Sequence, residues 1–316
     1  MKLEAECLDC PPSSERSIKP RPVKESIQEI NDNSWLIGDK ILLSRERFPS
    51  SNFTWSDGKG SFYAISEAPY PPPPSRPLSD TANIRMVYDA GGVSAVWSIG
   101  EAFCKVKVLD SGATREHVTL HYLHNKRPLS FAIPDVHYHA EHDGRYYIIL
   151  SSLAGQTVTE AWPNFDEAMK QHCVSQVVNS CKELAAWQAD SISGVDGNYL
   201  PDAFLGISKD FDPQTLLDSC RALEMDCSTF LFYHCDLGPG NIIVNHESGS
   251  IGIIDWETAG FVPKEWVRTK FCISGGMDLP GDDQESRADW RRRVQRQLGV
   301  EGFSEITDRW LTRNED

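Results

Sequence analysis

A short polar loop followed by two apolar runs is compatible with few folds, and such a segment lies late in this chain. The loop at 234–241 reads His-Cys-Asp-Leu-Gly-Pro-Gly-Asn. Residues 242–244 and 251–254 are apolar and the residues between them favour a turn, which predicts a β-hairpin. Because the second strand of a hairpin runs back beside the first, Asp255 is expected to lie next to Asn241.

This arrangement predicts the chemistry of phosphoryl transfer. The amide of Asn241 and the carboxylate of Asp255 are hard oxygen ligands, which suit Mg²⁺ and leave room in its shell for water and phosphate. Asp236 precedes them on the loop, where a carboxylate can orient an attacking hydroxyl and take its proton. We therefore predict Asp236 as the catalytic base and Asn241 and Asp255 as metal ligands. His234 belongs to this catalytic group, and anchoring of the loop by a buried hydrogen bond is favoured over a role as base.

These residues resemble the aminoglycoside phosphotransferase and choline kinase group of the protein-kinase-like superfamily, particularly its fungal-type members. Members of that group carry a His-x-Asp-x-x-x-x-Asn loop and then an Ile-Asp-Trp-Glu segment, which stands here at 254–257. The resemblance covers about residues 85–275. It implies an α+β, bilobal, protein-kinase-like fold with a small β-rich N-lobe and a larger helical C-lobe, and it implies ATP and Mg²⁺ as cofactors.

The resemblance also implies the nucleotide contacts. A strand lysine should hold the phosphates, and Lys105 is preferred over Lys107, which remains a competitor because alternate strand residues share a face. Glu116 on the following helix should pair with that lysine. Glu257 is left open between a second metal site and a role in fixing the loop. Two further sets of nucleotide contacts are expected. A phosphate-covering loop contributes Gly91, Gly92 and Ser94, and the hinge between the lobes contributes Ser151, Ser152 and Leu153. The glycine loop could equally be a plain hairpin turn.

The distribution of proline divides the chain. Eleven of the 19 prolines precede residue 78, and proline disfavours helices and central strands, so residues 1–80 are expected to form an irregular extension. The run of four prolines at 71–74 is interpreted as a stiff linker, with a ligand for an aromatic-groove domain as the alternative. Short strands predict an N-lobe at 81–154 that ends in the hinge. Apolar residues at intervals of three and four predict a helical C-lobe at 155–316, with helices at 166–189, 214–224 and 290–298.

Composition excludes several classes of protein. The chain has 31 Lys and Arg against 46 Asp and Glu, a net charge of −15, which disfavours nucleic acid as a partner. Its longest apolar run, at 146–150, is too short for a membrane span, and no secretion signal is evident. Nine scattered cysteines fit reduced thiols in the cytoplasm, and the Cys7–Cys10 spacing lacks a second pair to complete a zinc site.

The acceptor is expected to be a hydroxyl of a small molecule. Residues 258–263 follow Glu257 without a long activation segment, which disfavours a protein kinase. The acidic composition would suit a cationic acceptor. Two alternatives remain: a degenerate kinase fold that binds nucleotide or a partner without turnover, and a zinc-dependent hydrolase that uses the cluster His137, His139 and His142.

Overall fold

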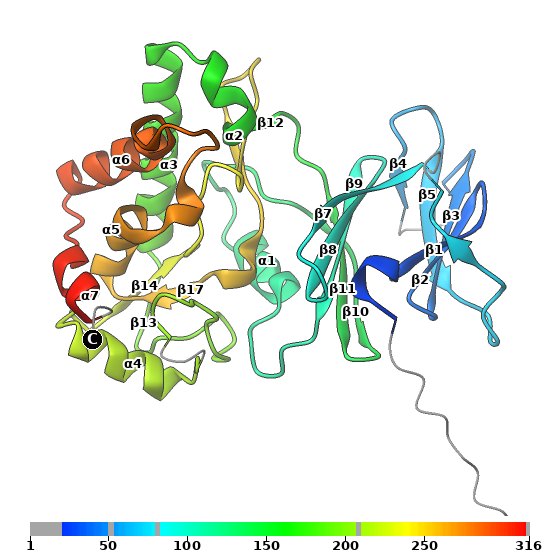
Figure 1. The fold of residues 1–316 in the computed structure, drawn as a ribbon, viewed down its shortest axis with the longest axis horizontal. Coiled ribbons are helices and arrows are strands. Elements are labelled where there is room, and N and C mark those ends of the chain that lie inside the picture. The colour runs from blue at the N-terminus through cyan, green and yellow to red at the C-terminus, as the bar shows by residue number, and fades with distance from the viewer. Residues whose placement is uncertain (1–20, 50–53, 80–82, 207–209, 314–316) are drawn as a thin grey trace, which may run out of the picture.

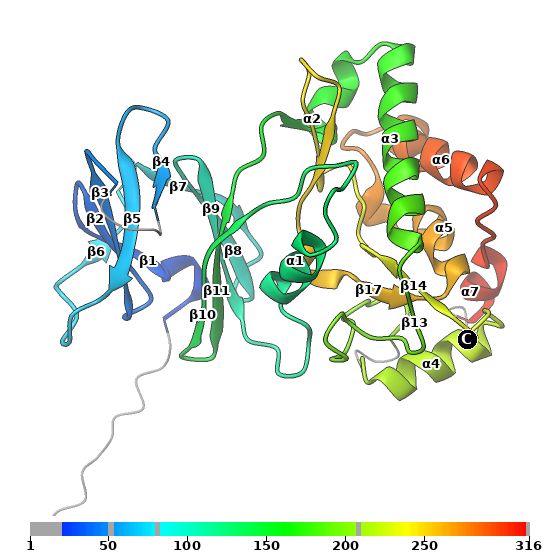
Figure 2. The same ribbon diagram turned by 180° about the vertical axis from the view of Figure 1, so that it is seen from behind.

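The computed structural model describes residues 21–49, 54–79, 83–206 and 210–313, which form three parts in a row (Figure 1). A six-stranded sheet near the N-terminus lies at one end, a five-stranded sheet lies in the middle, and a mostly helical lobe lies at the other end. Figure 2 shows from behind that helix α1 (Glu116–His124) lies between the five-stranded sheet and the helical lobe. The fold is therefore α+β and bilobal, as the sequence predicts, and the N-terminal sheet is added next to the five-stranded sheet.

The sequence predicts an irregular extension over residues 1–80, and the N-terminal sheet contradicts this for residues 21–49 and 54–79; residues 1–20 lie outside the described residues. The spatial order of the sheet is β4-β5-β3-β2-β1-β6, and a short helix η1 (Val23–Glu25) precedes it. The strands are β1 (Ile27–Asn31), β2 (Ser34–Ile37), β3 (Ile41–Glu46), β4 (Thr54–Ser56), β5 (Phe62–Glu67) and β6 (Arg76–Pro77). Proline content gave a wrong expectation here because several of these prolines lie at positions that a sheet tolerates: the 71–74 run connects β5 to β6, and Pro77 is on an edge strand. Cys7 and Cys10 lie outside the described residues.

The five-stranded sheet is antiparallel and has the order β10-β11-β9-β8-β7. Its strands are β7 (Ile84–Asp89), β8 (Ser94–Ile99), β9 (Ala102–Val108), β10 (Val136–His142) and β11 (Arg145–Ser151). Because strand side chains alternate between faces, Cys104 and Val106 pack in one core with the N-terminal sheet, whereas Lys105 and Lys107 face the helical lobe.

Strand β11 is buried on both faces, which explains its continuous apolar run. Tyr147 and Ile149 belong to the core shared with the N-terminal sheet. Tyr146, Ile148 and Leu150 belong instead to the core of the helical lobe. A strand between two packed layers needs apolar residues at every position rather than at alternate ones. The middle sheet is therefore covered on both sides.

The helical lobe contains α2 (Val158–Ala161), α3 (Glu167–Ala185), α4 (Pro213–Ala222), α5 (Lys264–Ile273), α6 (Gln284–Val300), α7 (Thr307–Arg313) and the short helices η2 (Trp162–Asn164), η3 (Trp256–Thr258) and η4 (Gly275–Met277). Helix α3 begins after Asp166, whose side chain accepts a hydrogen bond from the backbone N–H of Met169 at 2.8 Å. The sequence predicts this helix to residue 189, but it ends earlier. In the part of the chain that the structure describes, no helix has both the length and the apolar character that a membrane span requires.

Two small sheets complete this lobe and contain the predicted hairpin. One has the order β12-β15-β16 and the other the order β13-β14-β17. Their strands are β12 (Gln156–Thr157), β13 (Gln188–Ala189), β14 (Phe230–Tyr233), β15 (Ile242–Val244), β16 (Ile251–Ile253) and β17 (Gly260–Val262). The pairing of Ile242 with Ile253 confirms the hairpin and returns the chain to the end of the polar loop.

Candidate functional site

The polar loop at 234–241 is held in place by His234, whose side chain is fully buried. Its Nδ1 accepts a hydrogen bond from the backbone N–H of Asp236 at 3.2 Å, and its Nε2 donates to the backbone oxygen of Ile254 at 2.9 Å. Burial lowers the pKa of His234, which keeps the ring neutral and preserves this pattern of donor and acceptor. The ring therefore ties the loop to the end of the hairpin.

Asn241 orients the carboxylate of Asp236. Its Nδ2 donates to Oδ2 of Asp236 at 3.1 Å and to the backbone oxygen of Asp236 at 2.9 Å. The backbone oxygen of Asn241 accepts from the N–H of Ile254 at 3.0 Å, which closes the hairpin. Because the amide nitrogen is used in this way, the amide oxygen is the atom that Asn241 offers to a ligand. Burial raises the pKa of Asp236, and the positive charge of Lys270 partly opposes this rise.

Asp255 lies beside Lys105 at the end of the hairpin. Its backbone is left-handed, with φ 64° and ψ 60°. The Nζ of Lys105 lies 2.5 Å from Asp255 Oδ1, 2.6 Å from Glu257 Oε2 and 3.2 Å from Glu116 Oε2. Burial alone would lower the pKa of Lys105, but the charges of these three carboxylates outweigh burial and raise it well above its usual value. The lysine therefore stays charged in the space between the two lobes.

Glu116 connects three elements at this point. It lies in the first turn of α1, and its Oε1 accepts the backbone N–H of Trp256 at 3.1 Å. Burial raises the pKa of Glu116 to about 7, although Lys105 opposes the rise. Oxygen atoms of Glu116, Asp255 and Glu257 all lie within 4.8 Å of one another, a spacing that could hold a metal ion. Strand β9, helix α1 and the end of the hairpin thus meet in one charged cluster.

The structure distinguishes the two candidate lysines. Lys107 forms an ion pair with Glu257 at 3.0 Å, whereas Lys105 contacts Glu116, Asp255 and Glu257. Burial would raise the pKa of Glu257, but the two lysines outweigh burial and lower it to about 2. The sequence left the role of Glu257 open, and in this structure Glu257 connects the two lysines.

The glycine loop forms the turn between β7 and β8. The N–H of Gly91 donates to Asp89 Oδ1 at 2.8 Å, and the N–H of Ala90 donates to the backbone oxygen of Ser94 at 2.8 Å. Gly91 has φ 69°, and a Cβ at Gly91 or Gly92 would meet no other atom within 4 Å. Ser94 pairs with Lys107 in the sheet, so the turn lies at the end of the sheet near that lysine.

The segment after β11 joins the two lobes. Ser151 ends the strand, and the Oγ of Ser151 accepts the N–H of Asp135 at 2.9 Å. The N–H and the Oγ of Ser152 both donate to the backbone oxygen of Glu101, at 2.9 Å and 3.0 Å. Leu153 packs closely on Gly252, because a Cβ at position 252 would lie 2.5 Å from Leu153 Cδ1. We call residues 151–155 the connector.

Sequence reasoning missed a buried ion pair beneath the polar loop. Lys270 on α5 donates to Asp202 Oδ1 at 3.2 Å, and the Nε1 of Trp266 donates to Asp202 Oδ2 at 2.8 Å. Both members of the pair are nearly inaccessible, at 4% and 2% exposure. Asp202 is 68 residues away from Lys270 and stands in an irregular segment, so no spacing in the sequence connects the two.

The histidine cluster of the zinc alternative is not brought together. His139 stacks on His117 of α1 with ring centroids 3.7 Å apart, whereas His142 stacks on Tyr147 at 4.1 Å. His137 stacks on Trp55 of the N-terminal sheet at 5.4 Å. Within residues 21–49, 54–79, 83–206 and 210–313, the group of three residues with ligand atoms close enough for a metal is the Glu116, Asp255 and Glu257 set.

His117 is expected to make the protein less stable in mild acid. Burial, together with the nearby His139, lowers the pKa of His117 from 6.5 to about 4. The unfolded chain therefore takes up this proton first, and stability falls as the pH drops from about 6.5 towards 4. His117→Gln should show a smaller loss of melting temperature between pH 7 and pH 5 than the unaltered protein. The exposed His172→Gln serves as the control, and an equal effect of both variants would contradict this assignment.

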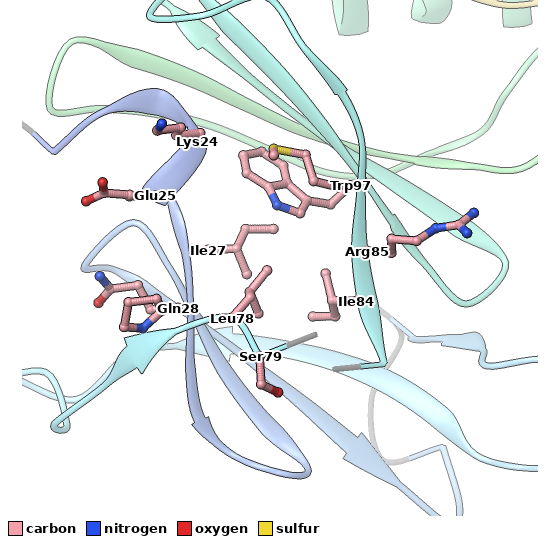
Figure 3. A pocket seen from close by; sticks show the side chains of 11 residues that line it. Lys24, Glu25, Ile27, Gln28, Leu78, Ser79, Ile84, Arg85 and Trp97 are labelled. Carbon is pink, nitrogen blue, oxygen red and sulfur yellow. The ribbon is translucent and has the colours of Figure 1, made fainter. Parts of the chain in front are cut away.

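Two hollows of the described chain lie away from the charged cluster. One, of about 860 Å³, is a groove between α1 and β10 that includes His121 and His139 among its lining residues. The other, of about 520 Å³, lies between the N-terminal sheet and β7–β8 (Figure 3). Its centre is apolar, with Ile27, Leu78 and Trp97, and charged side chains lie at its rim. Neither hollow includes the polar loop or the end of the hairpin.

Comparison with known proteins gives one family match and several similar folds. The model of the phosphotransferase enzyme family (APH) matches residues 100–263. A comparison with curated proteins gives no match. A crystal structure of aminoglycoside phosphotransferase APH(4)-Ia is 14% identical to this chain, with a TM-score of 0.48, and the match covers 69% of this chain and 77% of that one. A ternary complex of a thermostable mutant of the same protein with AMP-PNP and hygromycin B is 15% identical, with a TM-score of 0.49, and the match covers 75% of this chain and 84% of that one. The streptomycin–ATP–APH(2")-IIa complex is 18% identical over 68% and 76%, with a TM-score of 0.41.

Proposed function

Because the chain belongs to the phosphotransferase enzyme family, we propose that it transfers the γ-phosphoryl group of ATP to a hydroxyl group of a small molecule in a reaction that requires Mg²⁺. The resemblance inferred from the sequence is thereby confirmed at the level of the family. One observation supports the proposed transfer from ATP to a hydroxyl. Asp236, Asn241, Asp255 and Lys105 converge at one end of a rigid hairpin, between the two lobes.

Asp236 is the proposed base. It orients the acceptor hydroxyl and takes its proton as the acceptor oxygen bonds to the γ-phosphorus and the bond to ADP breaks. Asn241 fixes one carboxylate oxygen of Asp236, and His234 fixes the backbone of the same residue, so the base does not need to reorganise during the reaction. The raised pKa of Asp236, caused by burial, brings its basicity closer to that needed at neutral pH.

The residues at the end of the hairpin fit a magnesium ion. Carboxylate and amide oxygens are the ligands that this hard cation prefers, and Asp255 and Asn241 would supply them. When bound, Mg²⁺ neutralises charge on the β- and γ-phosphates. Glu116, Asp255 and Glu257 form a compact set of acidic oxygens, which supports the presence of a cation at this place. Lys105 supplies the positive charge in the structure described here.

Lys105 is the proposed phosphate ligand, and the two lysines provide a matched test. Lys105→Met should weaken the binding of Mg·ATP about tenfold to a hundredfold, the range that corresponds to a charged hydrogen bond. Lys107→Met should change the dissociation constant no more than about threefold, because a partly exposed ion pair contributes little. Isothermal titration gives both constants, and melting temperatures show whether each variant is folded. A larger effect from Lys107 would reverse the assignment.

A small and cationic acceptor is the proposed second substrate. After Glu257 the chain enters β17, which pairs directly with β14, so no long segment for docking a protein substrate is inserted here. The net charge of −15 favours cationic partners over polyanions such as nucleic acids. Every cysteine among the described residues is a free thiol, which supports a reducing compartment such as the cytoplasm.

Titration of ATP with and without Mg²⁺ tests the nucleotide half of this proposal. Nucleotide binding that depends on Mg²⁺ is expected, and its absence would refute the phosphotransferase proposal for this chain. A panel of amino alcohols, aminoglycosides and neutral sugars, with ADP release as the signal, then tests the acceptor. Nucleotide binding without transfer to any acceptor in the panel would favour the degenerate binding module instead.

A further inference from the structure

Strand β4 of the N-terminal sheet binds the turn between β8 and β9. The indole Nε1 of Trp55 donates a buried hydrogen bond of 2.6 Å to the backbone oxygen of Ile99. One residue further along β4, the backbone oxygen of Ser56 accepts the N–H of Glu101 at 3.0 Å. Strand β4 therefore holds this turn at two points, on either side of Gly100.

The same turn holds the connector between the lobes. The backbone oxygen of Glu101 accepts both the N–H of Ser152 at 2.9 Å and the Oγ of Ser152 at 3.0 Å. A continuous series of hydrogen bonds thus runs from Ser56 through Glu101 to Ser152. At the far end of the connector, Gly155 packs closely against the backbone of Val244, and the next residue, Gln156, pairs with Val244 in the sheet, so the connector is held at both ends.

The contact between β4 and the turn leaves no room for adjustment. Gly100 has φ 60°, and a Cβ at this position would lie 2.6 Å from the backbone oxygen of Ser56. The ring of Trp55 stacks on Tyr63 at 5.7 Å and on His137 at 5.4 Å. Trp55 and Tyr63 belong to the hydrophobic core that the two sheets share. Because close-packed interiors transmit displacements, a shift of β4 must move the turn.

We propose that the N-terminal sheet is a positioning element for nucleotide binding, in which β4 sets the backbone of Ser152 through the β8–β9 turn. This inference rests on the proposed function, because it takes residues 151–153 of the connector as the backbone that binds the purine. The family model matches residues 100–263, so the N-terminal sheet lies outside the matched residues. In this proposal the sheet acts on the site through the connector and not by contact with the nucleotide.

Two tryptophans of the N-terminal sheet provide a matched pair for the test. Trp55→Phe keeps an aromatic ring but removes the donor to Ile99. Trp35→Phe is the control, because the Nε1 of Trp35 is buried in the same core without a hydrogen-bond partner in the described structure. The Mg·ATP dissociation constant should rise by between twofold and about fivefold in Trp55→Phe, the free energy of one lost hydrogen bond being the upper limit, and by less than about twofold in Trp35→Phe. At saturating ATP, kcat should change less than about twofold in both, since Asp236 is untouched.

Two glycines provide a second, independent pair. Gly100→Ala places a Cβ against Ser56 and pushes β4 away from the turn. Gly144→Ala imposes a similar backbone strain, with φ 69°, at a turn where a Cβ would meet nothing within 4 Å. The expected result is weaker nucleotide binding in Gly100→Ala than in Gly144→Ala, measured at a temperature at which both variants are fully folded.

Hydrogen exchange separates this inference from the proposed function. In the protein without nucleotide, the amide of Ser152 should exchange faster in Trp55→Phe and Gly100→Ala than in their two controls. Equal exchange in variants and controls would overturn the positioning role, as would faster exchange without any change in nucleotide affinity. Failure of the unaltered protein to bind Mg·ATP would instead refute the proposed function, and the exchange comparison would still decide whether β4 holds Ser152.

Discussion

Asp236→Asn is expected to lower kcat for phosphoryl transfer about a thousandfold, within the range that a general base contributes. The substitution keeps the shape of the side chain and an oxygen that can accept the hydrogen bond from Asn241 Nδ2. It removes the group that takes the proton from the acceptor. Nucleotide binding should therefore change less than about threefold, because the proposed phosphate and metal ligands remain. Assays stopped at set times that measure both ADP and the phosphorylated acceptor give kcat, and isothermal titration gives the nucleotide affinity.

The control is Asp226→Asn, which changes an exposed carboxylate before β14 and should leave kcat within about twofold. A pH profile adds a second readout. Burial raises the pKa of Asp236 above 3.8, so kcat/KM of the unaltered protein should fall as the pH is lowered through this raised value. Transfer by Asp236→Asn at the rate of the unaltered protein would remove Asp236 from the role of base. Loss of nucleotide binding together with transfer would make its role structural.

Local patterns in the sequence were sufficient for the hairpin, for Asp236 and Asn241 on the loop before it, and for Asp255 at its end. Asp236 and Asn241 are close in sequence, and the alternation of apolar and turn residues between 242 and 254 determines where the strands begin and end. Asp255 could be placed beside Asn241 because the second strand of a hairpin runs antiparallel to the first and ends next to the residue where the first begins. Lys105 and Glu116 came instead from the resemblance to a family, since nothing in the spacing of β9 and α1 shows that they face Asp255.

The N-terminal sheet could not be predicted in this way because its strands are short and its stability comes from a neighbour. Trp35 and Ile37 look merely apolar in the sequence, and they are buried in one core with Trp97 and Val106 of the middle sheet. Proline content lowers the expectation of strands, but the proline run at 71–74 occupies a connection and does not interrupt any ladder of hydrogen bonds. Contacts between segments far apart in the chain decide such cases, and a single sequence does not reveal them.

The Asp202–Lys270 pair was missed for the same reason, yet Lys270 is on a helix that contacts the strand before the polar loop. Helix α5 packs on β14, the strand that leads into His234 and Asp236. The charge of Lys270 lowers the pKa of Asp236, against the dominant effect of burial. Lys270 also lies 4.3 Å from the ring centroid of Phe204, so its ammonium is enclosed by an aromatic ring as well as by Asp202. The pair therefore connects the stability of the lobe with the basicity of its proposed catalytic residue.

Lys270→Met is expected to lower the free energy of unfolding by about 3 kcal/mol, because it leaves the carboxylate of Asp202 buried without its charged partner. The control is Lys182→Met, which breaks an exposed pair with Glu301 and should cost less than about 1 kcal/mol. Urea unfolding followed by tryptophan fluorescence measures both. The double variant Asp202→Asn, Lys270→Met should recover part of the loss, since it removes the unpaired charge.

The activity of Lys270→Met tests the electrostatic connection to Asp236 separately from stability. Removal of the ammonium takes away a charge that lowers the pKa of Asp236, so the acidic limb of kcat/KM should move to higher pH. The same limb should not move in Lys182→Met, whose charge is at the surface and screened by solvent. A large loss of stability with an unmoved limb would limit Lys270 to a structural role. An unchanged stability would mean that Asp202 finds another partner, which its contact with Trp266 Nε1 alone does not supply because that group carries no charge.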